Sequence, residues 1–150
     1  MVDWKPSASL QNLQQRAEVL AKIRHFFSER DVLEVETPLL ASSTVPDVYI
    51  ESIAAEVTDG NSSHQNFLQT SPEYFMKRLL AYGSGSIYQI AKAFRQEEKG
   101  ARHNIEFTLL EWYRLSYSLD QLMTELEQLV QEILGCGPLL RFSYRQIFQQ

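Results

Sequence analysis

Two long stretches of the chain place apolar residues three and four positions apart, which is the spacing of one face of an α-helix. The first predicts a helix from Leu10 to about Arg30, capped by Ser9, and its apolar positions are Leu10, Leu13, Ala17, Leu20, Ile23 and Phe27. The second predicts a helix from Leu119 to Leu134. The glycines and the proline of 135–138 end that second helix.

Short runs in which apolar and polar residues alternate lie between these two helices and predict β-strands. The runs are 32–37, 49–57, 66–70, 86–94 and 106–114. The Asp, Gly, Asn and Ser residues of 59–63 predict a turn. The polar residues of 95–105 predict a loop that joins the last two strands into a hairpin.

A third, shorter helix is predicted from Ser71-Pro72-Glu73 to about Tyr82. Serine supplies a capping oxygen, proline fits the first turn, and an acidic residue suits the positive end of the helix dipole. The order of helix, strands, helix, hairpin and helix contains no run of βαβ units. It therefore favours an α+β fold, with an antiparallel sheet flanked by helices, in one domain that covers residues 1–150.

The charge balance argues against nucleic acid as a binding partner of these residues. Lysine and arginine number 14 against 19 aspartate and glutamate residues, for a net charge of −5. Tight nucleic-acid binding draws on clustered basic residues, so we do not expect these residues to form a tRNA-binding surface. The single cysteine, Cys136, can form neither an internal disulfide nor a zinc cluster, and no metal site is predicted. No apolar run is long enough for a membrane span or a signal core, which favours a cytoplasmic protein.

The strand at 106–114 carries the most informative chemistry. Its two-residue period places Phe107, Leu109, Glu111 and Tyr113 on one face. A carboxylate between buried aromatic rings is costly unless it has a partner. From the residues alone, a half-exposed strand with a salt-bridged Glu111 is the favoured interpretation, and a ligand-binding carboxylate is the alternative.

Two other positions are ambiguous in the same way. The loop that follows residue 94 contains Arg95, Arg102 and His103, which could clamp a polyphosphate, since guanidinium groups pair well with phosphate oxygens. A solvated charged loop is the simpler interpretation. Glu73 is fully explained as a helix-start residue, and only its context would make it a ligand for an amine.

Read together, these segments resemble a known family. Phe94-Arg95-Gln96-Glu97 followed by the segment from His103 to Tyr113 resembles motif 2 of the class II aminoacyl-tRNA synthetases, in their lysine branch. Phe26 to Pro38 resembles motif 1, and Thr70 to Leu79 is similar to the amino-acid-binding helix of that branch. The resemblance covers nearly the whole chain in the family's order.

Within the lysine branch, the short motifs Thr-Ser-Pro-Glu-Tyr and Glu-Trp-Tyr-Arg resemble those of the elongation factor P–lysine ligases, which are stand-alone catalytic cores. Few residues precede the first helix, so the anticodon-binding domain that precedes the core of lysyl-tRNA synthetases is not expected. No match to the family's motif 3 occurs in the chain. We therefore expect an incomplete core, the N-terminal portion of the catalytic domain, that is inactive alone.

The resemblance implies a reaction and its partners. ATP and a lysine-type amino acid, lysine or β-lysine, form an aminoacyl-adenylate, and the acyl group passes to a lysine of elongation factor P. Magnesium is expected in the full-length family, with its ligands outside this chain. Motif 1 implies a homodimer. The alternatives are a fragment of a lysyl-tRNA synthetase and a non-catalytic dimerisation module.

The resemblance also assigns roles by position. Arg95 is the expected catalytic residue, on the α-phosphate of ATP, and Phe107 is expected to stack on adenine. The expected ATP-binding residues are Arg95, Gln96, Glu97, Arg102, His103, Asn104 and Phe107. The expected substrate-binding residues are Ser71, Pro72, Glu73, Glu111 and Tyr113. One departure is Ile105, where the family usually has proline.

Overall fold

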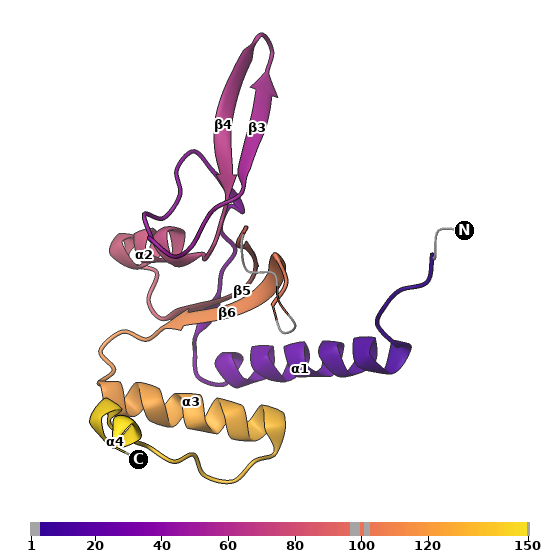
Figure 1. Ribbon diagram of the computed structural model, residues 1–150. Helices are drawn as coiled ribbons and strands as arrows, with labels where there is room; N and C mark the ends of the chain where they lie inside the picture. The colour runs from indigo at the N-terminus through magenta and orange to yellow at the C-terminus, as the bar shows by residue number, and fades with distance from the viewer. Residues whose placement is uncertain (1–3, 97–99, 101–102, 150) are drawn as a thin grey trace. The chain divides into compact units, whose positions relative to one another are not determined.

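The computed structural model describes residues 4–96, 100 and 103–149 of the 150-residue chain. It contains the helices α1 (Leu10–Ser28), α2 (Glu73–Tyr82), α3 (Leu119–Leu134) and α4 (Tyr144–Phe148) (Figure 1). Its strands are β1 (Leu33–Glu34), β2 (Leu40–Ala41), β3 (Ala54–Asp59), β4 (Ser62–Leu68), β5 (Ile87–Phe94) and β6 (Glu106–Tyr113). This mixed α+β content agrees with the predicted class. None of the helices in the described part of the chain is long and apolar enough to cross a lipid bilayer.

The chain divides into two compact units, and the first combines Met1–Arg30 with Ser116–Gln150. In this unit α1 begins where the Ser9 hydroxyl accepts a hydrogen bond of 3.1 Å from the Asn12 N–H. Ile23, Phe26 and Phe27 are buried on α1, and the two phenylalanine rings meet edge to face at 5.3 Å. The predicted helix is confirmed, although it ends two residues before Arg30.

The second helix of this unit, α3, has its predicted bounds and contacts α1. Ser118 and Gln121 form a capping box at its start, and Gly135 ends it with φ 64°, a left-handed conformation that glycine adopts at little cost. Glu127 then accepts a 2.9 Å hydrogen bond from the Leu139 N–H and pairs with Arg141 at 3.0 Å. The sequence analysis predicted no element at α4, because five residues are too few to show a helical period.

The second unit, Asp31–Leu115, contains both sheets. β5 and β6 pair antiparallel from Ile87↔Tyr113 to Phe94↔Glu106, as the predicted hairpin requires. β1 pairs with the other edge of β5 in parallel, so the predicted antiparallel pairing holds for β5 and β6 but is wrong for β1. The physical reason is that some fifty residues separate β1 from β5, which gives the chain room to return and enter the sheet in the same direction.

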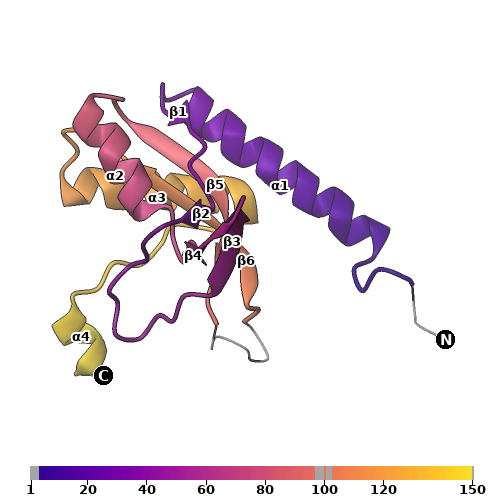
Figure 2. The same ribbon diagram turned by 90° about the horizontal axis from the view of Figure 1, so that it is seen from above.

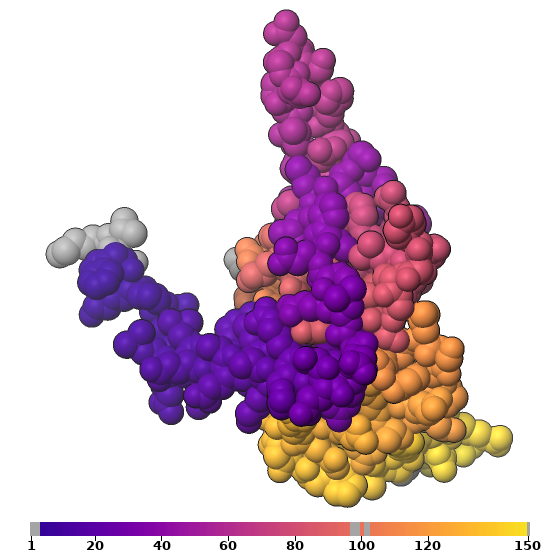
Figure 3. Space-filling view, turned by 180° about the vertical axis from the view of Figure 1, so that it is seen from behind, coloured from indigo at the N-terminus to yellow at the C-terminus, as the bar shows by residue number. Residues whose placement is uncertain are grey.

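The second sheet has the order β2-β4-β3 and contains the hairpin of β3 and β4, which projects from the rest of its unit (Figures 1 and 3). The predicted strand at 49–57 is wrong in its first half, because β3 begins at Ala54. The Asp47 carboxylate accepts a 2.9 Å hydrogen bond from the Tyr49 N–H, and such local bonds compete with strand pairing. The turn is shorter than the predicted one at 59–63 and consists of Gly60 and Asn61, because Ser62 and Ser63 already pair with β3.

Buried polar groups connect the elements around β5. The Gln69 amide donates to the Lys92 carbonyl over 2.8 Å, and the Thr37 hydroxyl donates to Gln89 Oε1 over 3.0 Å. The Phe94 N–H donates to the Gln69 carbonyl over 2.9 Å. The segment that leads from β4 into α2 is therefore tied to β5. In both ribbon views the loop between β2 and β3 lies on the same side of this unit as α2 (Figures 1 and 2).

Candidate active site

A single carboxylate joins the start of α2 to the middle of β6. The Ser71 hydroxyl donates to Glu111 Oε2 over 2.7 Å, and the Tyr113 hydroxyl donates to Glu111 Oε1 over 2.7 Å. Both oxygens of Glu111 thus accept hydrogen bonds from neutral groups. These bonds offset the desolvation of a half-buried carboxylate without neutralising its charge, so Glu111 remains able to attract a cation.

The protonation of Tyr113 supports this arrangement. Burial raises the pKa of the Tyr113 phenol above its usual range, and the hydrogen bond to Glu111 and the negative charges of Glu111 and Glu73 add to the shift. A phenol with a raised pKa keeps its proton at neutral pH. Tyr113 therefore acts as a donor that holds Glu111 in place.

The start of α2 places a second carboxylate near the first. Pro72 is the residue before the helix, and Glu73 is its first residue. The Ser71 hydroxyl accepts a 3.2 Å hydrogen bond from the Glu73 N–H while it donates to Glu111. A helix N-terminus favours a negatively charged side chain, as Glu73 supplies here. The predicted helix is confirmed, but its cap residue is Pro72 and not Ser71, and no side-chain cap hydrogen bond forms. The Ser71 hydroxyl instead bridges the helix start to β6.

These groups surround a cavity of about 450 Å³, here called the acidic cavity. Its charged lining residues are Asp47, Glu73, Arg95 and Glu111, and Ser71 and Leu109 also line it. The volume lies in the range of small-molecule sites. Three carboxylates and one guanidinium in this space suit a ligand that carries ammonium groups at one part and a negative charge at another.

Arg95 links the acidic cavity to Phe107. Its backbone N–H donates to the Ile105 carbonyl over 2.9 Å, and its Nε donates to the Thr70 carbonyl over 3.4 Å. Its guanidinium carbon lies 5.1 Å from the centroid of the Phe107 ring, within the range of a cation–π contact. The face of Phe107 is therefore next to the cationic end of the cavity.

The remaining predicted ATP-binding residues are not gathered in this cavity. The Gln96 N–H donates to the Glu51 carbonyl over 2.9 Å. His103 pairs with Gly100 across the end of the β5–β6 hairpin, and Asn104 is exposed. Glu97 and Arg102 lie outside the described residues. The structure thus brings Ser71, Glu73, Arg95 and Glu111 to one cavity, adds Tyr113 and Phe107 through direct contacts, and leaves the other roles as predictions.

The sequence analysis missed Asp47 and Tyr74, which also line the acidic cavity. Asp47 follows Pro46 in a loop without hydrophobic periodicity. The only feature of the sequence that could have drawn attention to Asp47 is local. An aspartate can accept a hydrogen bond from the backbone two residues later and so turn the chain. Tyr74 lies in the segment that resembles the amino-acid-binding helix, where no feature of the sequence separates it from a core aromatic residue.

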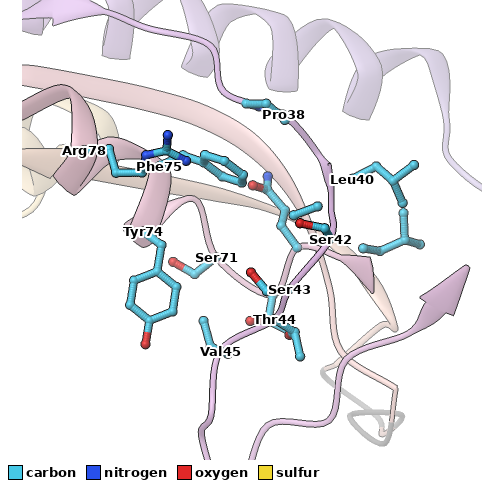
Figure 4. A pocket seen from close by; sticks show the side chains of 14 residues that line it. Pro38, Leu40, Ser42, Ser43, Thr44, Val45, Ser71, Tyr74, Phe75 and Arg78 are labelled. Atoms are coloured by element: carbon cyan, nitrogen blue, oxygen red, sulfur yellow. The ribbon is translucent and has the colours of Figure 1, made fainter. Parts of the chain in front are cut away.

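A larger cavity of about 570 Å³ adjoins the acidic cavity and shares Val45, Thr70, Ser71 and Tyr74 with it. Figure 4 shows it between the loop that contains Pro38 and Ser43 and the helix α2 that carries Arg78. Among the described residues that line it, Arg78 is the one with a charged side chain. An ammonium group would find no carboxylate there, so the smaller cavity is the candidate active site.

The described residues contain no group of three or more His, Cys, Asp or Glu side chains placed to hold a metal ion. The magnesium that the family resemblance implies finds no ligand set among these described residues.

Comparison with known proteins shows the family of this chain. The family model described as tRNA synthetases class II (D, K and N) matches residues 1–136. A protein from Vibrio vulnificus (strain YJ016) is 52% identical over 148 residues, which are 97% of this chain and 46% of the relative. A protein from Haemophilus influenzae (strain PittGG) is 50% identical over 149 residues, 98% of this chain and 46% of the relative.

Both relatives are named elongation factor P–(R)-β-lysine ligase. A relative from Salmonella paratyphi B (strain ATCC BAA-1250 / SPB7), 49% identical over 98% of this chain and 46% of its own length, has the same name. The chain therefore spans about half the length of the curated relatives that it matches. The match over residues 1–136 includes α1, α2, β5 and β6, and with it the whole acidic cavity. The chain belongs to the class II tRNA synthetase family of the D, K and N type.

Proposed function

We propose that this chain forms part of the catalytic core of an ATP-dependent ligase. The enzyme would activate a lysine-type amino acid, β-lysine, as its adenylate and transfer the acyl group to a lysine of elongation factor P. The names of the relatives support the reaction. The observation that carries the proposal is the carboxylate of Glu111, held by the hydroxyls of Ser71 and Tyr113 inside a cavity that also contains Glu73 and Arg95.

The two ends of the cavity suit the two ends of such a substrate. Glu111 and Tyr113 would bind the distal ammonium, and Glu73 would bind the amine nearer the carboxyl group. Arg95 would bind the α-phosphate of ATP, where negative charge develops as pyrophosphate leaves. Phe107 would stack on adenine, for which the Arg95 guanidinium must leave the ring face that it now covers.

Residues outside this chain would complete the catalytic core, since the chain spans 46% of the relatives' length. The acidic cavity contains one guanidinium among its described lining residues, which is little for a triphosphate. We therefore expect the isolated chain to show no lysine-dependent exchange of pyrophosphate into ATP, and robust exchange would refute this part of the proposal. A homodimer and a cytoplasmic location fit a family whose relatives act on a translation factor.

The pocket assignment is tested by the affinity of the chain for β-lysine. Glu111→Gln removes the charge that should bind the distal ammonium, and we expect a loss of about 1.5–3 kcal/mol of binding free energy. Glu106→Gln is the matched control, because Glu106 lies on the same strand but pairs with Lys92 at 2.9 Å and does not line the cavity. Calorimetric titration should separate the two variants. Equal β-lysine affinity in the parent and Glu111→Gln would leave Glu111 a structural carboxylate.

A lysyl-tRNA synthetase fragment is the alternative within the same family. The family model covers enzymes of the aspartate, lysine and asparagine type, so the residues of the acidic cavity suit either acceptor. Charging of lysine tRNA by a longer form of this protein would favour the alternative.

A further inference from the structure

Glu73 has a partner outside the acidic cavity. Lys77 lies one helical turn further along α2, and its ammonium contacts Glu73 Oε1. The side chains are 54% and 44% exposed, respectively. Glu73 lines the cavity and Lys77 does not. The carboxylate thus lies between the cavity and a lysine ammonium of the protein itself.

The negative groups around this ion pair act on the Lys77 ammonium. Glu73 raises the pKa of Lys77 through the hydrogen bond and through its charge, and the nearby Tyr74 and Glu111 raise it further. Lys77 therefore lies within the electrostatic influence of both carboxylates that are expected to bind substrate. An incoming ammonium would occupy the same field and would seek the same Glu73 oxygens.

We infer that Lys77 is the resident counter-ion of Glu73, which a substrate amine must displace or share, so that Lys77 tunes the affinity of the cavity for amines. This inference rests on the proposed function, since it requires amines to bind at Glu73. It adds a specificity-determining residue that does not itself line the cavity.

The exposure of the pair explains how such a counter-ion can be exchanged. An exposed ion pair between residues four apart on a helix is weak, because water screens it and two long side chains must be ordered to form it. Lys77 can therefore keep the charge of Glu73 balanced in the empty cavity and leave at little cost. A buried pair would hold Glu73 too firmly to be released.

The first test follows the Lys77 side chain by NMR in a chain with isotope-labelled lysine. In the parent, the Lys77 pKa should lie above the ordinary lysine value of about 10.4, and it should return toward that value in Glu73→Gln. Addition of free lysine should move the Lys77 signal of the parent toward its position in Glu73→Gln. The Tyr113 ring signal reports binding in the cavity independently.

The outcomes separate the inference from the proposed function. A Tyr113 signal that responds to lysine while Lys77 stays unchanged overturns the inference alone. If neither the Tyr113 signal nor the Lys77 signal responds to lysine, both the inference and the proposed function are overturned. A Lys77 pKa that is the same in the parent and in Glu73→Gln shows that the pair does not form in solution and also overturns the inference.

The second test compares two variants that each remove one positive charge from α2. Lys77→Met should bind lysine about twofold more tightly, because the variant lacks the ammonium that competes for Glu73. The factor is small because an exposed ion pair is weak. Arg78→Met is the matched control, because Arg78 lies over the Phe75 ring at 5.8 Å instead of contacting Glu73, and its lysine affinity should match the parent. Lys77→Gln gives the same comparison if Lys77→Met does not fold. Weaker binding in both Lys77 variants, or equal changes in Lys77→Met and Arg78→Met, contradicts the inference.

Discussion

The Ser71 hydroxyl donates a 2.7 Å hydrogen bond to Oε2 of Glu111, a residue 40 positions further along the chain. This bond joins the residue pair before α2 to the middle of β6. Because Ser71 also accepts from the Glu73 N–H, one hydroxyl orients both a helix start and a carboxylate. The position of Glu111 in the acidic cavity therefore depends on a side chain from another element.

Ser71→Ala should lower both stability and amine binding. The substitution leaves Glu111 Oε2 without its donor in a half-buried position, and we expect the free energy of unfolding to fall by about 1–2 kcal/mol. Affinity for β-lysine should fall as well, because Glu111 loses its orientation. Urea denaturation and calorimetric titration measure the two effects.

The control for this prediction is Ser63→Ala. Ser63 also donates to a glutamate, Glu56, but both residues are exposed on the β3–β4 hairpin. Its removal should change the free energy of unfolding by less than about 0.5 kcal/mol. Similar losses in the two variants would show that the Ser71 bond has no special role.

The raised pKa of Tyr113 should make the stability of the chain depend on pH in the alkaline range. Its pKa is raised in the folded chain, mainly by burial, so the unfolded chain loses the proton first as the pH rises. The stability that Tyr113 contributes is therefore complete below the ordinary tyrosine value of about 10 and is lost as the pH rises toward the folded value.

The measurement is chemical denaturation in the parent and in Tyr113→Phe at a series of alkaline pH values. The parent should lose stability more steeply above about pH 10. Tyr82→Phe, which changes an exposed tyrosine on α2, should follow the parent. Parallel curves for the parent and Tyr113→Phe would mean that the folded chain does not protect the Tyr113 proton.

The parts of the structure that sequence could predict are those with local causes. Ser9 caps α1, as its position before an apolar-periodic segment predicts. The hairpin of β5 and β6 follows from two alternating runs joined by a polar loop. The common face of Phe107, Glu111 and Tyr113 follows from the two-residue period of a strand. Each of these predictions needs only neighbouring residues.

The parts that sequence could not predict depend on distant residues. The parallel pairing of Leu33 with Ile87 joins segments that no local pattern relates. Asp47 reaches the acidic cavity because its loop lies beside α2, which follows from the packing of the unit. The hydroxyl donors of Glu111 were not predicted, since a salt bridge was the expected partner. A strand period does not show which side chains meet across elements.

Dimerisation through the helix Leu10–Arg30 and the strand Val32–Thr37 remains a prediction. Phe26, Phe27 and Val32, which were expected to supply its apolar surface, are buried within the chain, so other residues must supply it. Leu10 and Leu13 are 79% and 47% exposed on this helix, and the resemblance of Phe26 to Pro38 to motif 1 implies a subunit interface. We expect sedimentation equilibrium to show a dimer on the order of 10 µM. Replacing Leu10 and Leu13 by aspartate should shift the chain to monomer, whereas Leu140→Asp, at a leucine exposed outside α1, should not. A parent that is monomeric at that concentration would contradict the prediction.

Phe107→Ala should weaken ATP binding and spare the amino acid. Phe107 and Glu111 lie four residues apart on the same face of β6, paired with Ala93 and Gln89 of β5, which places them about 13 Å apart along the strand. This separation allows adenine and the distal ammonium of the substrate to bind at different ends. Loss of a ring that stacks on a base costs about 1–3 kcal/mol, so ATP affinity should fall by that amount.

The control is Phe67→Ala, which removes a half-buried ring of the same size from β4, outside the acidic cavity. Calorimetric titrations with ATP and with β-lysine should show a selective loss of ATP affinity in Phe107→Ala alone. If Phe107 is instead a structural ring, its removal lowers thermal stability and weakens both ligands together, as any general loosening of β6 would. Because Arg95 covers the Phe107 ring at 5.1 Å and is expected to bind the α-phosphate, ATP binding to the parent should also shift the Arg95 side-chain NMR signal. In Phe107→Ala the same shift should need a higher ATP concentration.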